Sequence, residues 1–171
     1  MNLETHYHAP WCLAVKIITA LSLVLLLAVA GYGALFFSPT APPFVRLTVT
    51  ILPLAIIFAT LPFMVRGFVL APGELRVERL GWQNRFALAD VVSVKIDPEA
   101  LRGSIRLWGS GGLFGFFGIF RNRQLGVYHA YGTDPKLAVI LKLNQRTIVV
   151  TPEHPERFVA ELETLRARET A

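Results

Sequence analysis

The residues with the clearest potential for chemistry lie in one uncharged stretch, Leu107–Phe120, which reads LWGSGGLFGFFGIF. It contains five glycines, four phenylalanines and one tryptophan. A glycine-rich loop that binds phosphate carries a lysine close to its glycines, and this stretch has no lysine and many bulky rings. Ser110 also lacks the glycine two positions before it that a nucleophile elbow requires. The stretch is therefore neither a phosphate loop nor a hydrolase nucleophile.

The other candidates for catalysis or metal binding are isolated in the sequence. His6 and His8 lie two positions apart without a third ligand nearby, whereas structural zinc takes four ligands. His129 lies in an alternating run and Asp134 in a Thr-Asp-Pro turn, so a strand histidine and a turn-forming aspartate account for them. We expect no enzyme, no metal and no cofactor. A hydrolase or transporter component that uses His129 or Asp134 stays as a third hypothesis.

Two long apolar runs precede the glycine-rich stretch. Residues 17–37 and 47–65 contain no charged side chain, and about 20 helical residues cross a hydrocarbon core of ~30 Å. The prolines of residues 38–43 cannot continue a helix. We therefore predict an N-terminal tail over 1–16 and a transmembrane hairpin over 17–65. A cleaved signal peptide is the alternative for the first run, although that run is longer than a signal-peptide apolar region.

The glycine-rich stretch itself is too short for a third span, because as a helix it covers only about 21 Å. Positive charge follows the second apolar run at Arg66, Arg76, Arg79 and Arg85, while the hairpin loop offers only Arg46. By the positive-inside rule, both chain ends are expected in the cytoplasm. No ionisable residue lies at membrane depth, so no transport path is indicated. No block of like charge indicates a nucleic-acid partner.

Residues 66–171 are organised differently, as short alternating segments followed by one helix. The alternating runs include Glu74–Leu80 and Val91–Ile96, and each is typical of a half-buried strand. At the end of the chain, Phe158, Leu162 and Leu165 form one apolar stripe at helical spacing. Six or seven strands and this helix predict a small barrel or sandwich capped by a helix.

A spaced glycine and aromatic pattern adds a family resemblance. The pattern runs through Arg106–Gly109, Gly112–Gly115, Gly118–Phe120, Gly126–Tyr128, Tyr131–Thr133 and Thr151–Phe158. Over about residues 66–168 the chain resembles bacterial pleckstrin-homology-like (PH) domains, whose members often carry membrane helices ahead of the domain. The resemblance implies two near-orthogonal sheets of about seven antiparallel strands and a C-terminal capping α-helix. It does not imply phosphoinositide binding, because the first hairpin turn, Pro72-Gly73, is short and not basic.

The expected protein is an integral protein of the bacterial inner membrane with a cytoplasmic PH-like domain. Two interpretations of the glycine-rich stretch stay open. In the first, it is a glycine-rich connection within the sheet and its rings fill the domain core. In the second, some of the rings contact the bilayer or a partner while nearby arginines meet anionic headgroups, at about 1 kcal/mol each. The candidate contact residues are Arg102, Arg106, Trp108, Phe114, Phe116, Phe117, Arg121 and Arg123.

The expected function is a non-enzymatic, membrane-anchored binding or scaffold module that engages the membrane surface or a partner protein. The alternative is a structural subunit of a larger membrane complex, assembled or self-associated through the transmembrane hairpin.

Overall fold

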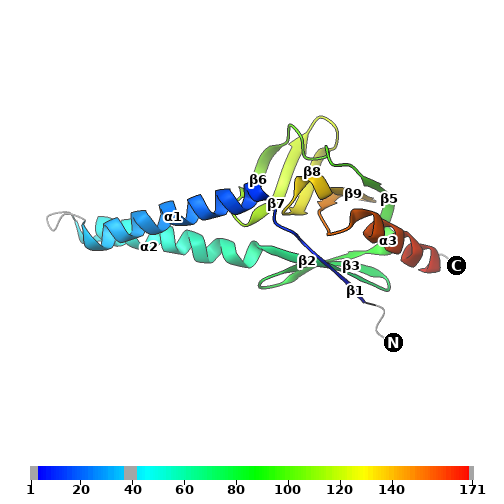
Figure 1. The fold of residues 1–171 in the computed structure, drawn as a ribbon, viewed down its shortest axis with the longest axis horizontal. Coiled ribbons are helices and arrows are strands. Elements are labelled where there is room, and N and C mark those ends of the chain that lie inside the picture. The colour runs from blue at the N-terminus through cyan, green and yellow to red at the C-terminus, as the bar shows by residue number, and fades with distance from the viewer. Residues whose placement is uncertain (1–3, 37–41, 170–171) are drawn as a thin grey trace.

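The computed structural model describes residues 4–36 and 42–169. Two long helices project from a strand-rich domain, and a third helix lies at the far end of that domain (Figure 1). The α-helices are α1 (Leu13–Leu35), α2 (Pro43–Thr60) and α3 (Pro155–Glu169), and the short 3-10 helices are η1 (Leu61–Phe63), η2 (Leu88–Asp90) and η3 (Pro135–Leu137).

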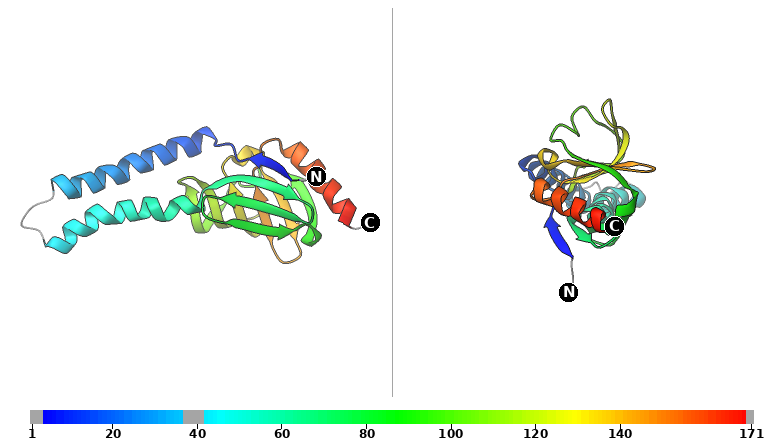
Figure 2. Two further views of the ribbon diagram at one scale, coloured as in Figure 1. Left: turned by 90° about the horizontal axis from the view of Figure 1, so that it is seen from below. Right: turned by 90° about the vertical axis from the view of Figure 1, so that its right-hand side faces the viewer.

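The strands form two sheets. The first has the order β1-β2-β3-β4, with β1 (Thr5–His8), β2 (Val65–Ala71), β3 (Glu74–Arg79) and β4 (Gln83–Ala87). The second has the order β5-β9-β10-β8-β7-β6, with β5 (Val91–Ile96), β6 (Ile105–Gly112), β7 (Gly115–Asn122), β8 (Gly126–Gly132), β9 (Val139–Leu143) and β10 (Thr147–Val150). Figure 2 shows the six-stranded sheet extending to one side of the helical hairpin in its end-on view.

Two sheets and a C-terminal helix confirm the predicted fold class, with two corrections. β10 pairs with β8 in parallel, because the chain passes from β8 through η3 to β9 and the β9–β10 hairpin then places β10 between β9 and β8. The barrel is also wrong in detail: within the described residues, no strand of one sheet pairs with a strand of the other, so the barrel is not closed.

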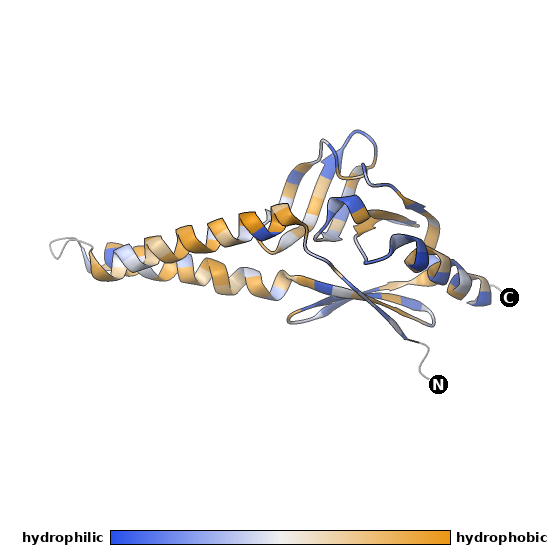
Figure 3. Ribbon diagram, in the orientation of Figure 1, coloured by the Kyte–Doolittle hydropathy of each residue, from blue (hydrophilic) through white to orange (hydrophobic). Residues whose placement is uncertain are grey.

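The helical hairpin has the length and composition to cross a membrane. Apolar residues follow both helices along their whole length (Figure 3), and most of their side chains are exposed, such as Leu21 and Val24 at 66%. A core helix of a soluble domain would bury them. The helices meet where α1 has Gly33, because a Cβ there would lie 2.8 Å from Thr50 Oγ1 of α2.

The helix boundaries differ by a few residues from the sequence prediction. α1 begins at Leu13, where Cys12 Sγ accepts a weak hydrogen bond from the Val15 amide. α2 ends at Thr60, because the chain tightens into η1 around Pro62 and then enters β2 after a single residue. The second helix therefore joins the domain without a flexible linker.

The N-terminal segment forms a strand that the sequence did not predict. β1 pairs with β2 in antiparallel register, with Tyr7 opposite Phe68. The Tyr7 hydroxyl donates to Glu161 Oε2 of α3 at 2.6 Å, and Thr5 also donates to the Glu161 carboxylate. Burial and this hydrogen bond raise the pKa of the Tyr7 phenol. Residues before the first helix thus bind both the first sheet and the last helix.

The main core lies between the two sheets and α3. The predicted stripe of α3 is buried there, with Phe158 and Leu162 fully covered and Leu165 at 8% exposure. Phe68 and Leu75 contribute from the first sheet. Burial of such side chains is worth about 1.5–3 kcal/mol each, so α3 is held by its apolar face, as the sequence pattern predicts.

Candidate functional site

The Leu107–Phe120 stretch is a β-hairpin, formed by β6 and β7 around a turn at Leu113 and Phe114. The sequence predicted a glycine-rich connection instead. Gly109 and Gly118 are paired across the two strands, with φ of 104° and 120°. A Cβ at Gly118 would lie 2.2 Å from the Trp108 carbonyl oxygen. The strands can therefore approach each other this closely only without side chains at this pair.

The turn of the β6–β7 hairpin is fixed to the first long helix, α1. Thr19 Oγ1 accepts a hydrogen bond from the Phe114 amide at 3.0 Å and donates to the Gly112 carbonyl at 3.3 Å. Ile18 packs so closely on Gly112 that a Cβ there would lie 2.8 Å from its Cγ2. Thr19 belongs to the first turns of α1, so the hairpin turn lies at the end of the helix nearest the domain.

The start of α1 is fixed to the domain by a second set of contacts. The Cys12 amide donates to the Thr133 carbonyl at 3.3 Å, and the Thr133 hydroxyl donates to the Pro10 carbonyl at 2.8 Å. Trp11 lies 6.3 Å from Phe114 between ring centroids. The start of α1 therefore has a defined orientation relative to the domain.

β6 is an edge strand of its sheet, and it contacts α1. Its apolar side chains are exposed: Ile105 at 70%, Leu107 at 54% and Trp108 at 75%. A register shift between Arg106 and Trp108 places one extra residue in this strand, and such a bulge re-aims the neighbouring side chains. The result is an exposed apolar strip on a strand that contacts α1, which we call the β6 strip.

The β6–β7 hairpin separates two clefts. The first, called the loop cleft, has a volume of about 550 Å³ and lies between the hairpin and the loop of residues 97–104. Phe116 and Phe120 form its floor, and Arg102 and Lys136 line it. Arg102 is paired with Glu99 at 2.9 Å, and its side chain is 84% exposed. The cations of the loop cleft are thus solvated or already paired.

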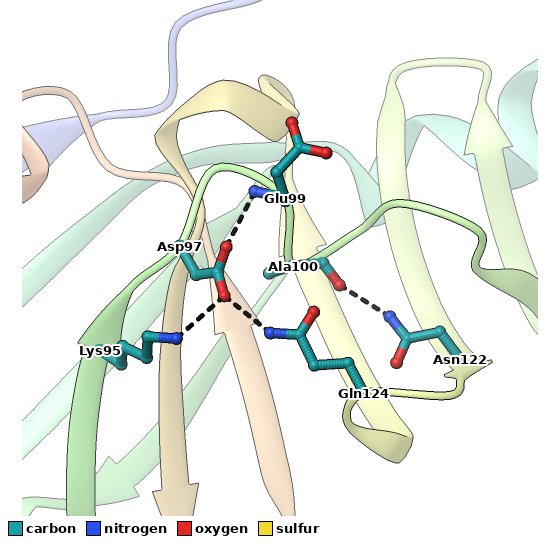
Figure 4. Close-up of polar contacts among 6 residues, drawn as sticks. All are labelled: Lys95, Asp97, Glu99, Ala100, Asn122 and Gln124. Atoms are coloured by element: carbon teal, nitrogen blue, oxygen red, sulfur yellow. Dashed lines mark hydrogen bonds and ion pairs between the residues drawn. The ribbon is translucent and has the colours of Figure 1, made fainter.

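A polar cluster fixes the loop beside this cleft (Figure 4). Asp97 accepts hydrogen bonds from Gln124 Nε2 at 2.7 Å and from the Glu99 amide at 3.0 Å, and it pairs with Lys95 at 3.3 Å. The hydrogen bond from Gln124, followed by the other contacts, lowers the pKa of Asp97. Asn122 Nδ2 donates to the Ala100 carbonyl at 2.7 Å.

The second cleft, called the helix cleft, has a volume of about 590 Å³ and lies on the other face of the hairpin. Ala59 and Thr60 at the end of α2 line one side, and Trp108 and Phe117 line the other. Arg79, the last residue of β3, also lines this cleft.

Arg79 is surrounded by aromatic rings. The guanidinium carbon lies 5.1 Å from the Tyr131 ring centroid, 5.5 Å from Trp82, 5.8 Å from Phe63 and 5.9 Å from Phe117. Its Nε is buried without a hydrogen-bond acceptor, and no carboxylate of the described residues lies within ion-pair distance. Burial lowers the pKa of Arg79. Because arginine still keeps its charge, the cleft contains a cation without an anion.

The groups proposed for catalysis do not come together. His129 lines the helix cleft, and burial, with a smaller effect of Arg146, lowers its pKa. The Asp134 carboxylate instead caps η3 by accepting from the Lys136 amide. Ser110 donates to the Leu113 carbonyl at 2.9 Å. Within residues 4–36 and 42–169, no three His, Cys, Asp or Glu side chains are placed to bind a metal ion.

The predicted contact residues divide between the two clefts. Arg102 and Phe116 line the loop cleft, whereas Arg106, Trp108 and Phe117 line the helix cleft. Phe114 and Phe117 are buried, each at 6% exposure, so these rings belong to the protein interior. Arg121 and Arg123 are exposed at the opposite end of the hairpin from the turn that contacts α1.

Arg79 is the residue that the sequence analysis missed. It was counted only as a positive charge after the second span. Its position carried a stronger signal: Arg79 follows Leu75 and Val77 at steps of two, so it shares their buried face of β3. A charged residue in phase with a buried face is the pattern that identifies it.

A model of the family described as "Bacterial PH domain" matches residues 66–166. The matched part is more than half of the chain and covers β2 to α3. No curated protein matches the chain.

Proposed function

The chain belongs to the bacterial PH domain family, and we propose that it acts as a non-enzymatic, membrane-anchored binding module. PH-like domains generally bind rather than catalyse. α1 and α2 are the membrane anchor, in the bacterial inner membrane, and the domain is cytoplasmic by the distribution of positive charge. The surface that the domain engages is the membrane itself, through the β6 strip.

The observation that carries this proposal is the exposed apolar β6 strip on the strand that touches α1. The hydrogen bonds of Thr19 hold the adjoining hairpin turn against the anchor, so the strip has one orientation relative to the bilayer. Exposed apolar patches of this kind mark interaction surfaces, and tryptophan favours the membrane interface. Arg106, exposed beside Leu107, adds attraction to anionic headgroups.

Retention of the first helix in the mature chain is part of the proposal. Signal-peptide cleavage in the first apolar run, after Ala30, would remove β1 and its pairing with β2. It would also take away the two Thr19 hydrogen bonds that hold the β6–β7 turn. These contacts favour an anchor helix over a cleaved signal peptide.

The test measures the depth of Trp108 in a bilayer. The full chain with Trp11 and Trp82 replaced by phenylalanine is reconstituted into vesicles containing lipids brominated near the top of their chains. Trp108 fluorescence should be strongly quenched. The matched control replaces Trp108 by phenylalanine and Val92 by tryptophan, because Val92 is exposed at 61% on β5, the opposite edge of the same sheet.

A control tryptophan at position 92 should stay unquenched. Equal quenching at the two positions, or none at Trp108, would exclude the β6 strip as a membrane contact.

The alternative of a structural subunit, assembled through α1 and α2, predicts instead that the chain extracted in mild detergent migrates as part of a larger complex. A lone monomer counts against that alternative.

A further inference from the structure

The helix cleft has the size and lining of a ligand site. Small-molecule sites are usually about 300–1,000 Å³ with apolar walls and a few polar groups, and this cleft measures about 590 Å³. Phe63, Phe117 and Ile119 supply apolar wall, while Arg79 and His129 supply polar groups. The volume accommodates a headgroup and a few methylene groups, and it is too small for a whole membrane lipid.

Arg79 defines the charge of a ligand that would fit the helix cleft. The surrounding rings offset part of the cost of burying its charge, but they provide no oxygen acceptor for its N–H groups. Nε is buried and unpaired. A phosphate or carboxylate would accept two parallel N–H bonds from the guanidinium. The ligand that completes this environment is therefore an anion.

The position of the cleft defines the route of entry. Ala59 and Thr60, which line it, are the last residues of α2, and the exposed Phe58 precedes them. The cleft thus begins where the second membrane helix ends. A molecule that slides along α2 from the bilayer reaches Arg79 without leaving an apolar surface, which is the path of an amphiphile rather than of a small soluble anion.

We infer that the helix cleft binds the anionic headgroup of a membrane lipid, with Arg79 as the partner of the anion and the acyl chains left in the bilayer beside α2. The cleft shares Leu107 and Trp108 with the β6 strip, and the inference rests on the proposed membrane anchoring of the chain. The loop cleft is not such a site, because Arg102 is exposed and paired with Glu99.

The experiment is lipid competition on the full chain. The protein is incubated in mixed micelles with equal amounts of phosphatidylglycerol and phosphatidylcholine, and retained lipids are counted by native mass spectrometry. One phosphatidylglycerol per chain should be enriched. Arg79→Met should reduce the enrichment at least about tenfold, as expected for loss of a charge-assisted hydrogen-bonded pair. Arg102→Met, the matched control, should change it less than about twofold.

Enrichment that survives Arg79→Met, or that Arg102→Met removes equally, overturns the inference. Displacement of the lipid by inorganic phosphate at the same concentration also overturns it, because the ligand is then a soluble anion. Ala59→Trp provides a second variant that narrows the cleft and leaves Arg79 in place, and it must also abolish the enrichment. Because Trp108 also lines the helix cleft, its quenching is measured in Arg79→Met as well as in the parent chain. Quenching that survives Arg79→Met reports the β6 contact alone, so failure of the β6 contact and failure of the lipid site give different results.

Discussion

The clefts on the two faces of the β6–β7 hairpin are lined by the same residue types, phenylalanine and arginine, in opposite arrangements. On the loop-cleft face, Phe116 and Phe120 form the floor while Arg102 stands in solvent beside Glu99. On the helix-cleft face, the rings enclose Arg79 itself. A surface ion pair contributes little, about 0–1 kcal/mol, whereas an enclosed cation without a partner lowers stability.

This difference distinguishes an ordinary surface arginine, Arg102, from an arginine whose surroundings indicate a binding role, Arg79. An exposed, paired arginine needs no ligand to explain it. A half-buried arginine with an unpaired Nε, next to the end of a long apolar helix, costs stability in the isolated chain, and such local costs are typical of functional sites. The comparison between the two clefts depends on the β6–β7 hairpin that forms their shared wall, on the unpaired Nε of Arg79, and on the different pH responses of His129 and Asp97.

The largest effect is expected from damage to the shared wall. Gly118→Ala should destabilise the domain by about 3 kcal/mol or more, because a Cβ at this positive φ is strained and also collides with the strand opposite. The collision would be with the Trp108 carbonyl oxygen, at 2.2 Å. Chemical unfolding in detergent, followed by near-UV circular dichroism, measures the change.

The matched control for this substitution is Gly126→Ala. Gly126 also has a positive φ, 68°, but nothing lies within 4 Å of a Cβ there. It should cost only about 1–2 kcal/mol, the strain of the backbone alone. Equal losses of stability in Gly118→Ala and Gly126→Ala would show that the close approach of β6 and β7 does not stabilise the hairpin that separates the two clefts.

Replacing Arg79 is expected to have a smaller effect on stability, in the opposite direction. In the absence of acidic lipid, Arg79→Met should leave stability unchanged or raise it by about 1 kcal/mol, because replacing a half-buried charge by an apolar side chain removes its desolvation cost. Arg102→Met should change stability by less than about 0.5 kcal/mol. Unfolding of the two variants in neutral detergent provides the measurement, and a clear loss of stability for Arg79→Met would contradict the view that its charge lacks a partner.

Much of the fold was predictable, because it depends on local periodicity. The alternation of Glu74–Leu80 and the stripe through Phe158 and Leu162 each identify one element and its buried face. The family resemblance over 66–168 agrees with the matched residues 66–166. The strands β6 and β7 were missed because five glycines in Leu107–Phe120 weaken any strand pattern, and their pairing depends on close backbone approach across the hairpin.

The candidate site was less predictable, because it depends on contacts between distant segments. The sequence drew attention to the exposed arginines and to Phe114 and Phe117, two rings that are buried. β1 escaped prediction because its partner strand lies more than 50 residues away along the chain. Arg79 is enclosed by rings from η1, β7 and β8, and no local pattern brings these segments together.

The smallest effect is a difference in pH response between the two faces. Burial lowers the pKa of His129 in the folded chain below its ordinary 6.5, so the unfolded chain binds the proton more tightly. The contribution of His129 to stability is therefore fully present above about pH 6.5. It is lost as the pH falls toward the pKa of His129 in the folded chain. On the loop-cleft face, Asp97 also has a lowered pKa, but its contribution is present above about pH 4 and is lost only in stronger acid.

Unfolding curves between pH 7 and pH 3 should resolve the two windows. His129→Gln should flatten the decline that begins below about pH 6.5 and leave the acid decline intact. Asp97→Asn should do the reverse. The effects are small because His129 is only partly buried and Asp97 is close to solvent, so each variant is compared with the parent chain at every pH. An unchanged slope in His129→Gln would mean that the proton reaches His129 as easily in the folded chain as in the unfolded one, and the helix cleft would then be no drier than the loop cleft.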